Sequence, residues 1–362
     1  MIAITGANGF LGKHCKIYCK INNIKNVLFI DKKNFRSKNT KNFLQECQYF
    51  IHLAGINKSS KGDLYKNNLN LNKYYLNILS KNKNLKKIIF TSSIHRDKKN
   101  QYGRSKLNSE NLLKNFCISK NIKLKILILT NIFGEFCKPN YNSVIATICN
   151  EVMNDKDFKI KINKKIKLIY VKDVVNNIFS NLKKNKPINN KHYTNISLNN
   201  LLIKIERFKA DYFNNVIPKF KNNFELNLFN TFRSYAFPKR IILKTKSFSD
   251  KRGSLWEVIK SKRNAHMFMS TTKKNNVRGN HFHTKKIERF IIMSGCGVIK
   301  FRHIFDDKIY KFKINSKDKN IIDIPTYCTH NLSNNKSKEL ITLFYSNEIY
   351  NPKKTDTYYE KV

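Results

Sequence analysis

The sequence has no apolar run long enough to cross a membrane and no cysteine pattern typical of disulfides. No apolar stretch approaches the ~20 residues of a membrane-spanning helix, so we expect no membrane insertion. The eight cysteines include no C-x-x-C pair, which favours a reduced, cytoplasmic protein. No signal peptide precedes the first predicted strand, and we find no internal repeat. The cysteines expected to be small buried thiols are Cys15, Cys19, Cys47, Cys117, Cys137 and Cys149.

Acidic residues are scarce, with 24 Asp and Glu against 71 Lys and Arg and a formal net charge of +47. The lysines are spread through every segment, and Asn, Ile and Phe are also abundant, as AT-rich coding would produce. A nucleic-acid-binding surface needs clustered charge and aromatic stacking platforms, so we expect no nucleic-acid partner. The positive field should still attract anionic, nucleotide-linked substrates.

Residues 1–130 alternate short apolar runs with helical patterns. This alternation predicts a parallel, doubly wound α/β sheet of the Rossmann type. Residues 131–238 are less regular and are expected to form a substrate-facing cap, with a strand entering a helix at Ile166–Val175 and a surface loop at residues 186–200. The strands expected before the cap are Ile2–Thr5, Asn26–Ile30, Tyr49–Leu53, Lys87–Thr91 and Lys123–Leu129, with helices at Leu11–Asn22 and Asn68–Lys81.

From about Ile241 onward, short β-branched and aromatic segments recur between turns. Turns at this spacing predict an all-β barrel or sandwich. We therefore expect an NAD(P)-binding domain at residues 1–238 and an all-β domain at residues 239–362. The predicted turns lie at Asp250–Gly253, Lys273–Asn276, Ser294–Gly297, Asp306-Asp307 and Ser316–Asp318.

A glycine-rich segment, Thr5–Gly12, follows the first predicted strand and precedes a helix. Glycine lets the backbone approach a pyrophosphate, and the helix N-terminus offers free N–H groups. Asp31, at the end of the second predicted strand, would bond a ribose 2′-hydroxyl and favours NAD. Lys32, Lys33 and Arg36 would instead hold the 2′-phosphate of NADP. The expected cofactor contacts in the turn are Gly6, Asn8, Gly9, Phe10, Leu11 and Gly12.

Tyr102 and Lys106 are four residues apart and would face one side of a helix. An ammonium beside a phenol favours the phenolate, so we expect Lys106 to lower the pKa of Tyr102. Tyr102 would then exchange a proton with a carbonyl or alkoxide while a nicotinamide exchanges a hydride. Ser93, after the strand that ends at Thr91, is expected to bond the same oxygen, in preference to Ser92.

Residues 1–235 resemble the extended short-chain dehydrogenase/reductase family through the glycine-rich turn and Tyr102-Gly103-Arg104-Ser105-Lys106. The resemblance implies that Leu53, Ala54 and Gly55, after His52, lie under the cofactor. It also implies that Asn131 faces the substrate. The family often has an arginine where this chain has Ile128.

Three histidines and one glutamate in the C-terminal part have metal-ligand spacing. His281 and His283 alternate on one strand face, Glu288 follows after a tight turn, and His330 comes from a distant strand. This donor set suits one zinc ion, and also Fe, Mn or Ni. The four residues, with Gly279, Gly295, Pro325 and Asn334 around them, resemble the cupin family, in which Tyr327 would usually be glycine. A metal-free barrel whose histidines act as acids or bases stays an alternative. His303 is a candidate catalytic base or a hydrogen-bonded barrel histidine.

The combination of both parts resembles the bifunctional enzymes of capsular polysaccharide synthesis that make a precursor of UDP-N-acetyl-L-fucosamine. The resemblance implies metal-dependent C3 epimerisation of a UDP-linked 4-keto-6-deoxy-2-acetamido sugar in the cupin, then reduction of the C4 ketone with NADPH. It also implies a homodimer, and it includes Asn140 and Asn142 as substrate contacts. Its most specific segments are Phe136–Thr147, Gly279–Glu288, Phe301-Arg302-His303 and Asp356-Thr357-Tyr358.

An NAD-dependent nucleotide-sugar 4-epimerase or dehydratase, with a non-catalytic cupin used for dimerisation, is the alternative function. A 4,6-dehydratase needs an acidic residue beside its active-site Ser or Thr. Ile94 follows Ser93 here, which counts against a dehydratase.

Overall fold

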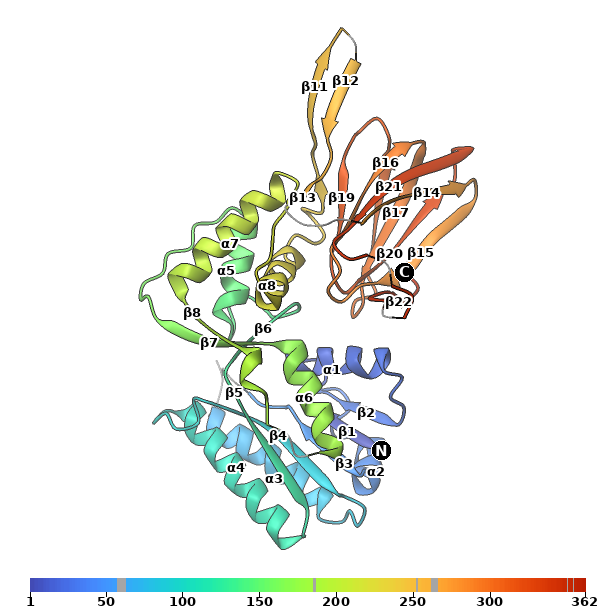
Figure 1. Cartoon of the computed structure of the whole chain (residues 1–362). Helices are drawn as coiled ribbons and strands as arrows, with labels where there is room; N and C mark the ends of the chain where they lie inside the picture. Colours follow the sequence, from blue (N-terminus) through green and yellow to red (C-terminus); the bar gives the residue numbers. More distant parts are fainter. Residues whose placement is uncertain (57–62, 185–186, 252, 262–265, 350, 354) are drawn as a thin grey trace. The chain divides into compact units, whose positions relative to one another are not determined.

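The computed structural model describes residues 1–56, 63–184, 187–251, 253–261, 266–349, 351–353 and 355–362 (Figure 1). The chain forms two compact units. Unit 1 contains Met1–Ser143 and Lys165–Ile196, and unit 2 contains Val144–Lys164 and Ser197–Val362. The region predicted as a cap is divided between the two units, and the domain boundary at residue 238 stays a prediction.

Unit 1 is built around a parallel five-stranded sheet with strand order β2-β1-β3-β4-β5. All five strands predicted from the apolar runs are present, which confirms the Rossmann-type fold class. In such a sheet, ligands bind beyond the carboxyl ends of the strands where the strand order reverses, here between β1 and β3. The strands are β1 (Ile2–Thr5), β2 (Val27–Ile30), β3 (Tyr49–His52), β4 (Lys87–Ser93) and β5 (Lys123–Leu129).

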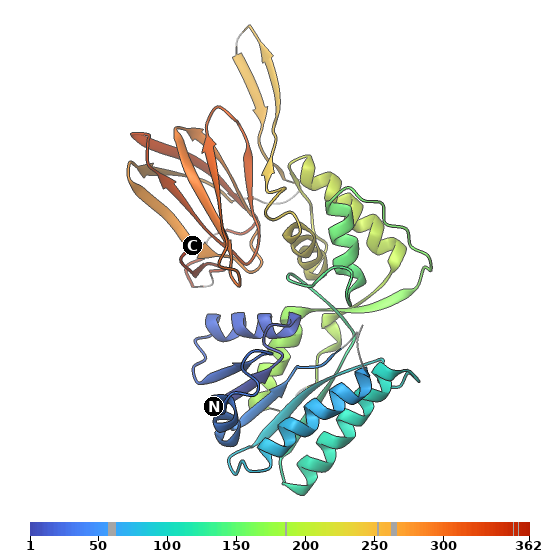
Figure 2. The same ribbon diagram turned by 180° about the vertical axis from the view of Figure 1, so that it is seen from behind.

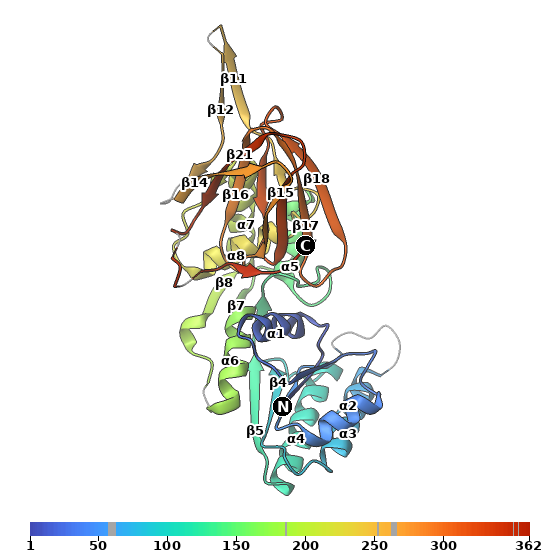
Figure 3. The same cartoon turned by 90° about the vertical axis from the view of Figure 1, so that its right-hand side faces the viewer.

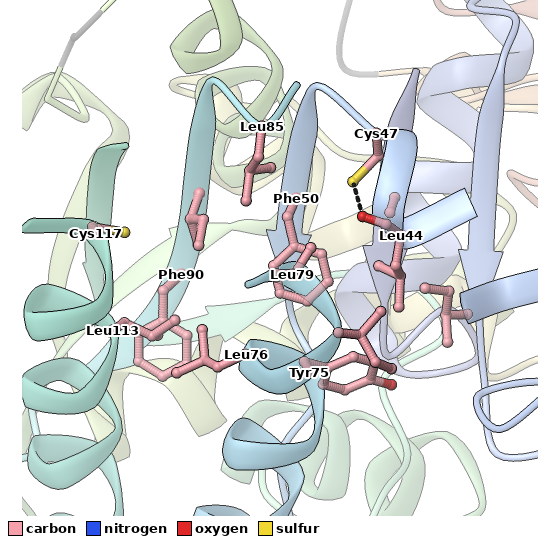
Figure 4. Packing of buried hydrophobic residues seen from close by; sticks show 14 residues of the cluster. Leu44, Cys47, Phe50, Tyr75, Leu76, Leu79, Leu85, Phe90, Leu113 and Cys117 are labelled. Carbon is pink, nitrogen blue, oxygen red and sulfur yellow. Dashed lines mark hydrogen bonds between the residues drawn. The ribbon is translucent and has the colours of Figure 1, made fainter. Parts of the chain in front are cut away.

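Two buried apolar layers cover the two faces of this sheet because successive strand residues point to opposite sides. One layer joins Ile4 and Ile51 to helices α1 and α6. The other joins Phe50 and Phe90 to α2, α3 and α4, and Figure 4 shows Leu44, Tyr75, Leu79 and Leu113 packed around them. Helices on both faces make the sheet doubly wound, as predicted. The helices are α1 (Phe10–Ile21), α2 (Lys38–Glu46), α3 (Leu64–Leu79), α4 (Gln101–Ser119) and α6 (Val171–Lys183).

A second, small sheet in unit 1 has the order β6-β7-β8. It consists of β6 (Asn131–Phe133), β7 (Lys165–Tyr170) and β8 (Tyr193–Ser197). The predicted strand and helix at Ile166–Val175 are thus confirmed as β7 and α6. The predicted loop at residues 186–200 is wrong for its described part, since a 3-10 helix (Asn190–His192), β8 and the start of α7 lie there; residue 186 lies outside the described residues.

Unit 2 begins with helices rather than with the irregular cap that we expected. The helices α5 (Val144–Met153), α7 (Leu198–Phe213) and α8 (Asn223–Ser234) pack against one another, as Figure 2 shows. Each has an apolar stripe, for example Leu228, Phe229 and Phe232 on α8, all fully buried. Interspersed Asn and Lys residues obscure these stripes in the sequence.

The rest of unit 2 is all-β, as predicted, with two antiparallel five-stranded sheets visible in Figure 3. Their orders are β10-β19-β16-β21-β14 and β18-β17-β20-β15-β22. The hairpin β11–β12 projects from them, and β13 pairs with β9. The predicted turns between strands are confirmed, although Arg252 lies outside the described residues. The strands are β9 (Val216–Ile217), β10 (Ile242–Leu243), β11 (Lys246–Asp250), β12 (Gly253–Glu257), β13 (Lys260–Ser261), β14 (His266–Lys273), β15 (Asn276–Phe282), β16 (Glu288–Ser294), β17 (Cys296–His303), β18 (Ile309–Asn315), β19 (Ile321–Ile324), β20 (Cys328–Asn334), β21 (Glu339–Ser346) and β22 (Tyr358–Tyr359).

A buried ionic cluster connects helix α8 to the β-sheets. Arg233 donates from Nη1 to both carboxylate oxygens of Asp323, at 2.8 and 2.9 Å, and Arg289 Nε donates to the same carboxylate at 2.9 Å. All three side chains are fully buried. Arg233 Nη2 also donates to the carbonyl oxygens of Ile324 and Lys286, at 2.8 and 3.2 Å. Helix α8 is therefore part of the same packed unit as the sheets.

Candidate active sites

The glycine-rich turn leaves no room for larger residues at two positions. Gly6 has a φ of +72°, and a Cβ there would lie 2.9 Å from the backbone nitrogen of Ala54. A Cβ on Gly12 would lie 2.2 Å from the carbonyl oxygen of Gly6. Gly9 is the N-cap of α1, and Phe10 and Leu11 begin the helix. The turn thus joins the carboxyl end of β1 to a helix N-terminus, directly beside the segment that follows β3.

Asp31 follows β2 and is already engaged in local hydrogen bonds. Its carboxylate accepts from the backbone N–H of Lys33 at 2.7 Å and from the side chain of Asn8 at 2.7 Å. The bond from Lys33 N–H is the main reason that the pKa of Asp31 is below its ordinary value. The side chain of Asn8 also accepts from Lys16 Nζ at 2.8 Å. Lys32, Lys33 and Arg36, which follow Asp31 in the sequence, are exposed.

A buried polar network holds the segment after β3, and the sequence did not reveal it. Thr5 Oγ1 accepts from the N–H groups of Leu53 and Ala54, at 3.2 and 3.1 Å, and lies 2.7 Å from His52 Nδ1. The other nitrogen of His52 lies 3.1 Å from Asn72 Oδ1. Burial is the main reason that the pKa of His52 is lowered to about 3, so the ring is neutral. The network fixes Leu53, Ala54 and, next to them, Gly55 against the glycine-rich turn.

Tyr102 and Lys106 lie on α4, which Asn100 caps by accepting from Gly103 N–H at 2.8 Å. The Lys106 Nζ lies 6.0 Å from the centroid of the Tyr102 ring and donates to Thr91 O at 3.1 Å. A Cβ on Gly55 would lie 3.6 Å from this Nζ, which places Lys106 beside the segment after β3. Burial lowers the pKa of Lys106 to about 8, against the opposing effect of Glu110.

The expected lowering of the Tyr102 pKa by Lys106 is wrong for this structure. Burial raises the pKa of Tyr102, and a hydrogen bond with Ser93 opposes that rise. The Lys106 ammonium donates to the Thr91 carbonyl oxygen, and burial has the larger effect on the pKa of Tyr102. Ser92 Oγ donates to Glu110, which is fully buried, whereas Ser93 lies beside Tyr102; the preference for Ser93 stays a prediction.

The three asparagines expected at the substrate lie on or after β6. Asn131 is the first residue of β6 and donates to Lys167 O at 3.2 Å. Asn140 and Asn142 are exposed in the loop between β6 and α5. Ile128 lies opposite Ser92 on the edge strand β5 and is 40% exposed. The structure thus puts an apolar side chain where the related enzymes often have arginine.

The four predicted metal ligands meet in unit 2. His281, His283, Glu288 and His330 each offer a ligand atom, and these atoms all lie within 4.8 Å of one another. The Glu288 carboxylate oxygens lie 3.5 Å from His283 Nε2 and 3.8 Å from His330 Nε2. Residues from β15, β16 and β20 and from the segment after β15 are brought together, as the spacing predicted.

The protonation states and one orphaned atom in this cluster fit a divalent metal ion. Burial lowers the pKa of His281 to about 4, and that of His330 falls well below its ordinary value for the same reason. Burial alone would raise the pKa of Glu288, but His283 and His330 outweigh it and bring the value to about 2. His283 Nδ1 lies 2.6 Å from the carbonyl oxygen of Asp356, so it carries the proton. Its Nε2 is buried and has no hydrogen-bond partner among the described residues. Three imidazoles and a carboxylate in one buried cluster form a metal-binding donor set.

Two left-handed backbone positions shape this cluster. Gly279 has a φ of +105°, and a Cβ there would lie 2.7 Å from His330 O. A register shift in the pairing of β15 with β20 follows between Gly279 and His281. Tyr327 has a φ of +60° and is fully buried. A left-handed position explains why related sequences carry glycine there, and the tyrosine must bear the strain.

His303 lies on the same face of β17 as Phe301, which pairs with His330 across to β20. This places His303 on the face that carries a predicted ligand, with Cys328 opposite it. Phe237, which follows α8, contacts the rings of Phe301 and His303 at centroid distances of 6.2 and 6.5 Å. We did not predict Phe237 as part of the site, because no local pattern links it to a strand sixty-odd positions away.

Comparisons with known proteins identify the family. Residues 2–197 match the NAD dependent epimerase/dehydratase family, and residues 248–358 match the polysaccharide biosynthesis C-terminal domain. The chain therefore belongs to the NAD dependent epimerase/dehydratase family, whose enzymes use a nicotinamide cofactor. Among the described residues, no helix is both long and apolar enough to cross a membrane.

Similarity to known proteins over the full length of the chain identifies the type of enzyme within this family. The capsular polysaccharide assembling protein CapF from Staphylococcus aureus is 30% identical, with a TM-score of 0.64 covering 100% of this chain and 99% of that chain. The UDP-2-acetamido-2,6-beta-L-arabino-hexul-4-ose reductase of Pseudomonas aeruginosa is 26% identical over 99% of this chain and 97% of its own length. A UDP-glucuronic acid 4-epimerase from Bacillus cereus, 17% identical with a TM-score of 0.51, covers 58% of this chain and 83% of its own and shares the fold alone. With both parts present, the chain is of the CapF type.

Proposed function

We propose that this chain is a bifunctional UDP-sugar enzyme that epimerises C3 of a UDP-2-acetamido-4-keto-6-deoxy hexose and then reduces its C4 ketone. The observation that carries the proposal is the presence of two candidate catalytic sets in one chain. Tyr102, Lys106 and Ser93 converge in unit 1, and the four-residue cluster converges in unit 2. The relative from Pseudomonas aeruginosa is named as a reductase of such a UDP-linked ketone.

The reduction assigns one task to each residue of the first set. When bound, a nicotinamide cofactor supplies the hydride that reaches C4. Tyr102 donates its phenolic proton to the C4 oxygen, and Ser93 holds the same oxygen by a hydrogen bond. Lys106, cationic at neutral pH, stabilises the negative charge left on the phenol. Gly6, Gly9 and Gly12 permit the tight backbone turn that would present the N–H groups at the start of α1 to a pyrophosphate.

The epimerisation depends on the C4 ketone, which makes the C3 proton acidic. His281, His283, Glu288 and His330 would hold a zinc ion, and a bound divalent ion supplies electrophilic stabilisation of negative charge on oxygen. We propose His303 as the base that takes the C3 proton, since it faces the same side of β17 as Phe301. Return of a proton to the opposite face inverts C3, and the ketone is then ready for reduction.

We propose NADPH as the reductant, with Lys32, Lys33 and Arg36 as partners of its 2′-phosphate; Asp31 leaves NADH as the alternative. The eight free cysteines suit the reducing cytoplasm.

We also propose a homodimer. Phe248 and Leu255, paired across the hairpin β11–β12, are 60% and 61% exposed. Such apolar exposure on a projecting hairpin favours a protein partner.

The decisive experiment follows two signals from one reaction. The protein is incubated in heavy water with NADPH and the UDP-linked 4-keto-6-deoxy-2-acetamido sugar. We expect loss of NADPH absorbance and deuterium at C3. Tyr102→Phe should abolish the first signal and spare the second, while His281→Ala should remove deuterium exchange. Tyr359→Phe and His266→Ala, which replace the same residue types elsewhere, serve as matched controls.

Two outcomes would contradict the proposal. Deuterium exchange that survives His281→Ala but stops in Tyr102→Phe would reverse the assignment of the two sites. A protein that binds no metal ion would remove the proposed epimerisation mechanism while leaving the reductase.

A further inference from the structure

The segment between the ligands His283 and Glu288 is held at every one of its backbone N–H groups. It consists of Thr284, Lys285, Lys286 and Ile287, and it fixes the separation of two of the four proposed ligands. Its last N–H, from Ile287, donates to Asn347 Oδ1 at 2.7 Å. We call residues 284–287 the ligand loop.

Asp356, distant in sequence, binds the other N–H groups of the ligand loop. Its carboxylate accepts from Thr284 N–H at 3.0 Å, from Lys285 N–H at 2.7 Å and from Lys286 N–H at 2.8 Å. The Thr284 hydroxyl adds a bond of 2.6 Å. Asp356 is buried, with 4% exposure. A buried carboxylate is stable only when such donors satisfy it, so this carboxylate and the loop conformation depend on each other.

The same residue reaches a ligand directly through its backbone. The carbonyl oxygen of Asp356 accepts from His283 Nδ1 at 2.6 Å, which leaves Nε2 to face Glu288. Partners that fix the second nitrogen of a ligating histidine determine its tautomer and ring orientation. Asp356 therefore connects the orientation of His283 to the conformation of the loop that leads to Glu288.

Helix α8 holds the carbonyl side of the ligand loop. Asn230 Nδ2 donates to Lys285 O at 2.8 Å, and Arg233 Nη2 donates to Lys286 O at 3.2 Å. Because the carbonyl side is anchored independently, loss of the Asp356 carboxylate should loosen the N–H side without detaching the loop from the fold.

We propose that Asp356 is a positioning residue of the metal centre, which sets the geometry of His283 and Glu288 by binding the ligand loop. The inference rests on the proposed metal-dependent function. Asp356 itself contributes no ligand atom to the cluster.

The test measures metal affinity directly. Co²⁺ binding to the full-length protein is followed by its visible absorption and by competition with a chromophoric chelator. Asp356→Asn removes the charge and turns one acceptor into a donor facing the loop N–H groups. We expect affinity to fall by about 10- to 100-fold, with an altered Co²⁺ spectrum. Thr284→Val, which removes one bond and keeps the carboxylate, should produce a smaller loss with a shift in the same direction.

The controls separate a positioning role from a general loss of folding. Asp318→Asn replaces an aspartate that accepts from Asn315 in a surface turn and should bind Co²⁺ as the wild type does. NADPH affinity, which reports on unit 1, should be unchanged in every variant. Wild-type affinity and spectrum in folded Asp356→Asn would overturn the inference; if that variant does not fold, wild-type affinity in Thr284→Val would overturn it. Absence of Co²⁺ binding by the wild type would instead refute the proposed metal-dependent function, and the inference with it.

Discussion

Replacing Arg233 should destabilise unit 2 strongly, although the residue lies on a helix outside the all-β region. Arg233→Ala removes both bonds to Asp323 and leaves the carbonyl oxygens of Ile324 and Lys286 without their donor. Removing one partner of a buried ion pair costs about 3–5 kcal/mol. Asp323 keeps Arg289 Nε at 2.9 Å and the Tyr212 hydroxyl at 3.3 Å. We therefore expect a loss near the lower limit, about 3 kcal/mol.

Urea unfolding monitored by tryptophan fluorescence measures this loss in unit 2 specifically. The chain has one tryptophan, and Trp256 lies in β12 with Lys319 Nζ 4.4 Å from its ring centroid. Lys285→Ala, which removes an ion pair with the partly exposed Glu348 at 2.9 Å, is the control and should cost at most about 1 kcal/mol. A loss as small for Arg233→Ala as for this control would refute the argument that the cluster joins α8 to the sheets.

Three further predictions concern the cofactor site, the pH dependence of ketone reduction and the assembly of the protein. Gly12→Ala should weaken NADPH binding by roughly tenfold or more, because the new Cβ would lie 2.2 Å from the Gly6 carbonyl oxygen and moving that carbonyl costs at least ~1.4 kcal/mol. Fluorescence titration with NADPH measures this loss, and an unchanged affinity would contradict the prediction. Because the pKa of Lys106 is lowered to about 8, its cation is lost as pH rises through that value, so kcat/KM for ketone reduction should decline there, and Lys106→Arg should move the decline to higher pH. Phe248→Asp should shift the protein from dimer to monomer in light scattering, whereas Lys246→Asp, on the same strand, should not.

The sequence predicted those parts of the fold in which a local pattern carries the information. Apolar runs of four to seven residues identified the five strands of the large parallel sheet. The His281–His283 alternation with Glu288 identified three of the four side chains that do meet in the candidate metal cluster. Helices α7 and α8 were not predicted, because asparagine and lysine interrupt their apolar stripes. Strand β8 lies in an Asn- and Lys-rich segment whose composition favours a loop. It forms a strand because it pairs with β7.

The parts that the sequence could not predict depend on contacts between distant residues. Thr5 and Asn72 meet His52 from opposite sides, and Asp356 meets the ligand loop across 70 or more positions. The pKa of Tyr102 was misjudged for a related reason, since burial is a property of the folded environment and outweighs one helical neighbour. The segment Asp356-Thr357-Tyr358 is among the most specific parts of the family resemblance. The contacts of Asp356 that explain it form only in the folded structure.

The division into units has a consequence for recombination and engineering. The chain crosses from one unit to the other after Ser143, after Lys164 and after Ile196. A single cut near residue 238 would separate Arg233 from Asp323 and Asn230 from the ligand loop. An exchangeable β-module with the proposed metal centre intact must therefore carry α7 and α8 with it and include residues 144–164. The smallest transferable piece is thus discontinuous in the gene.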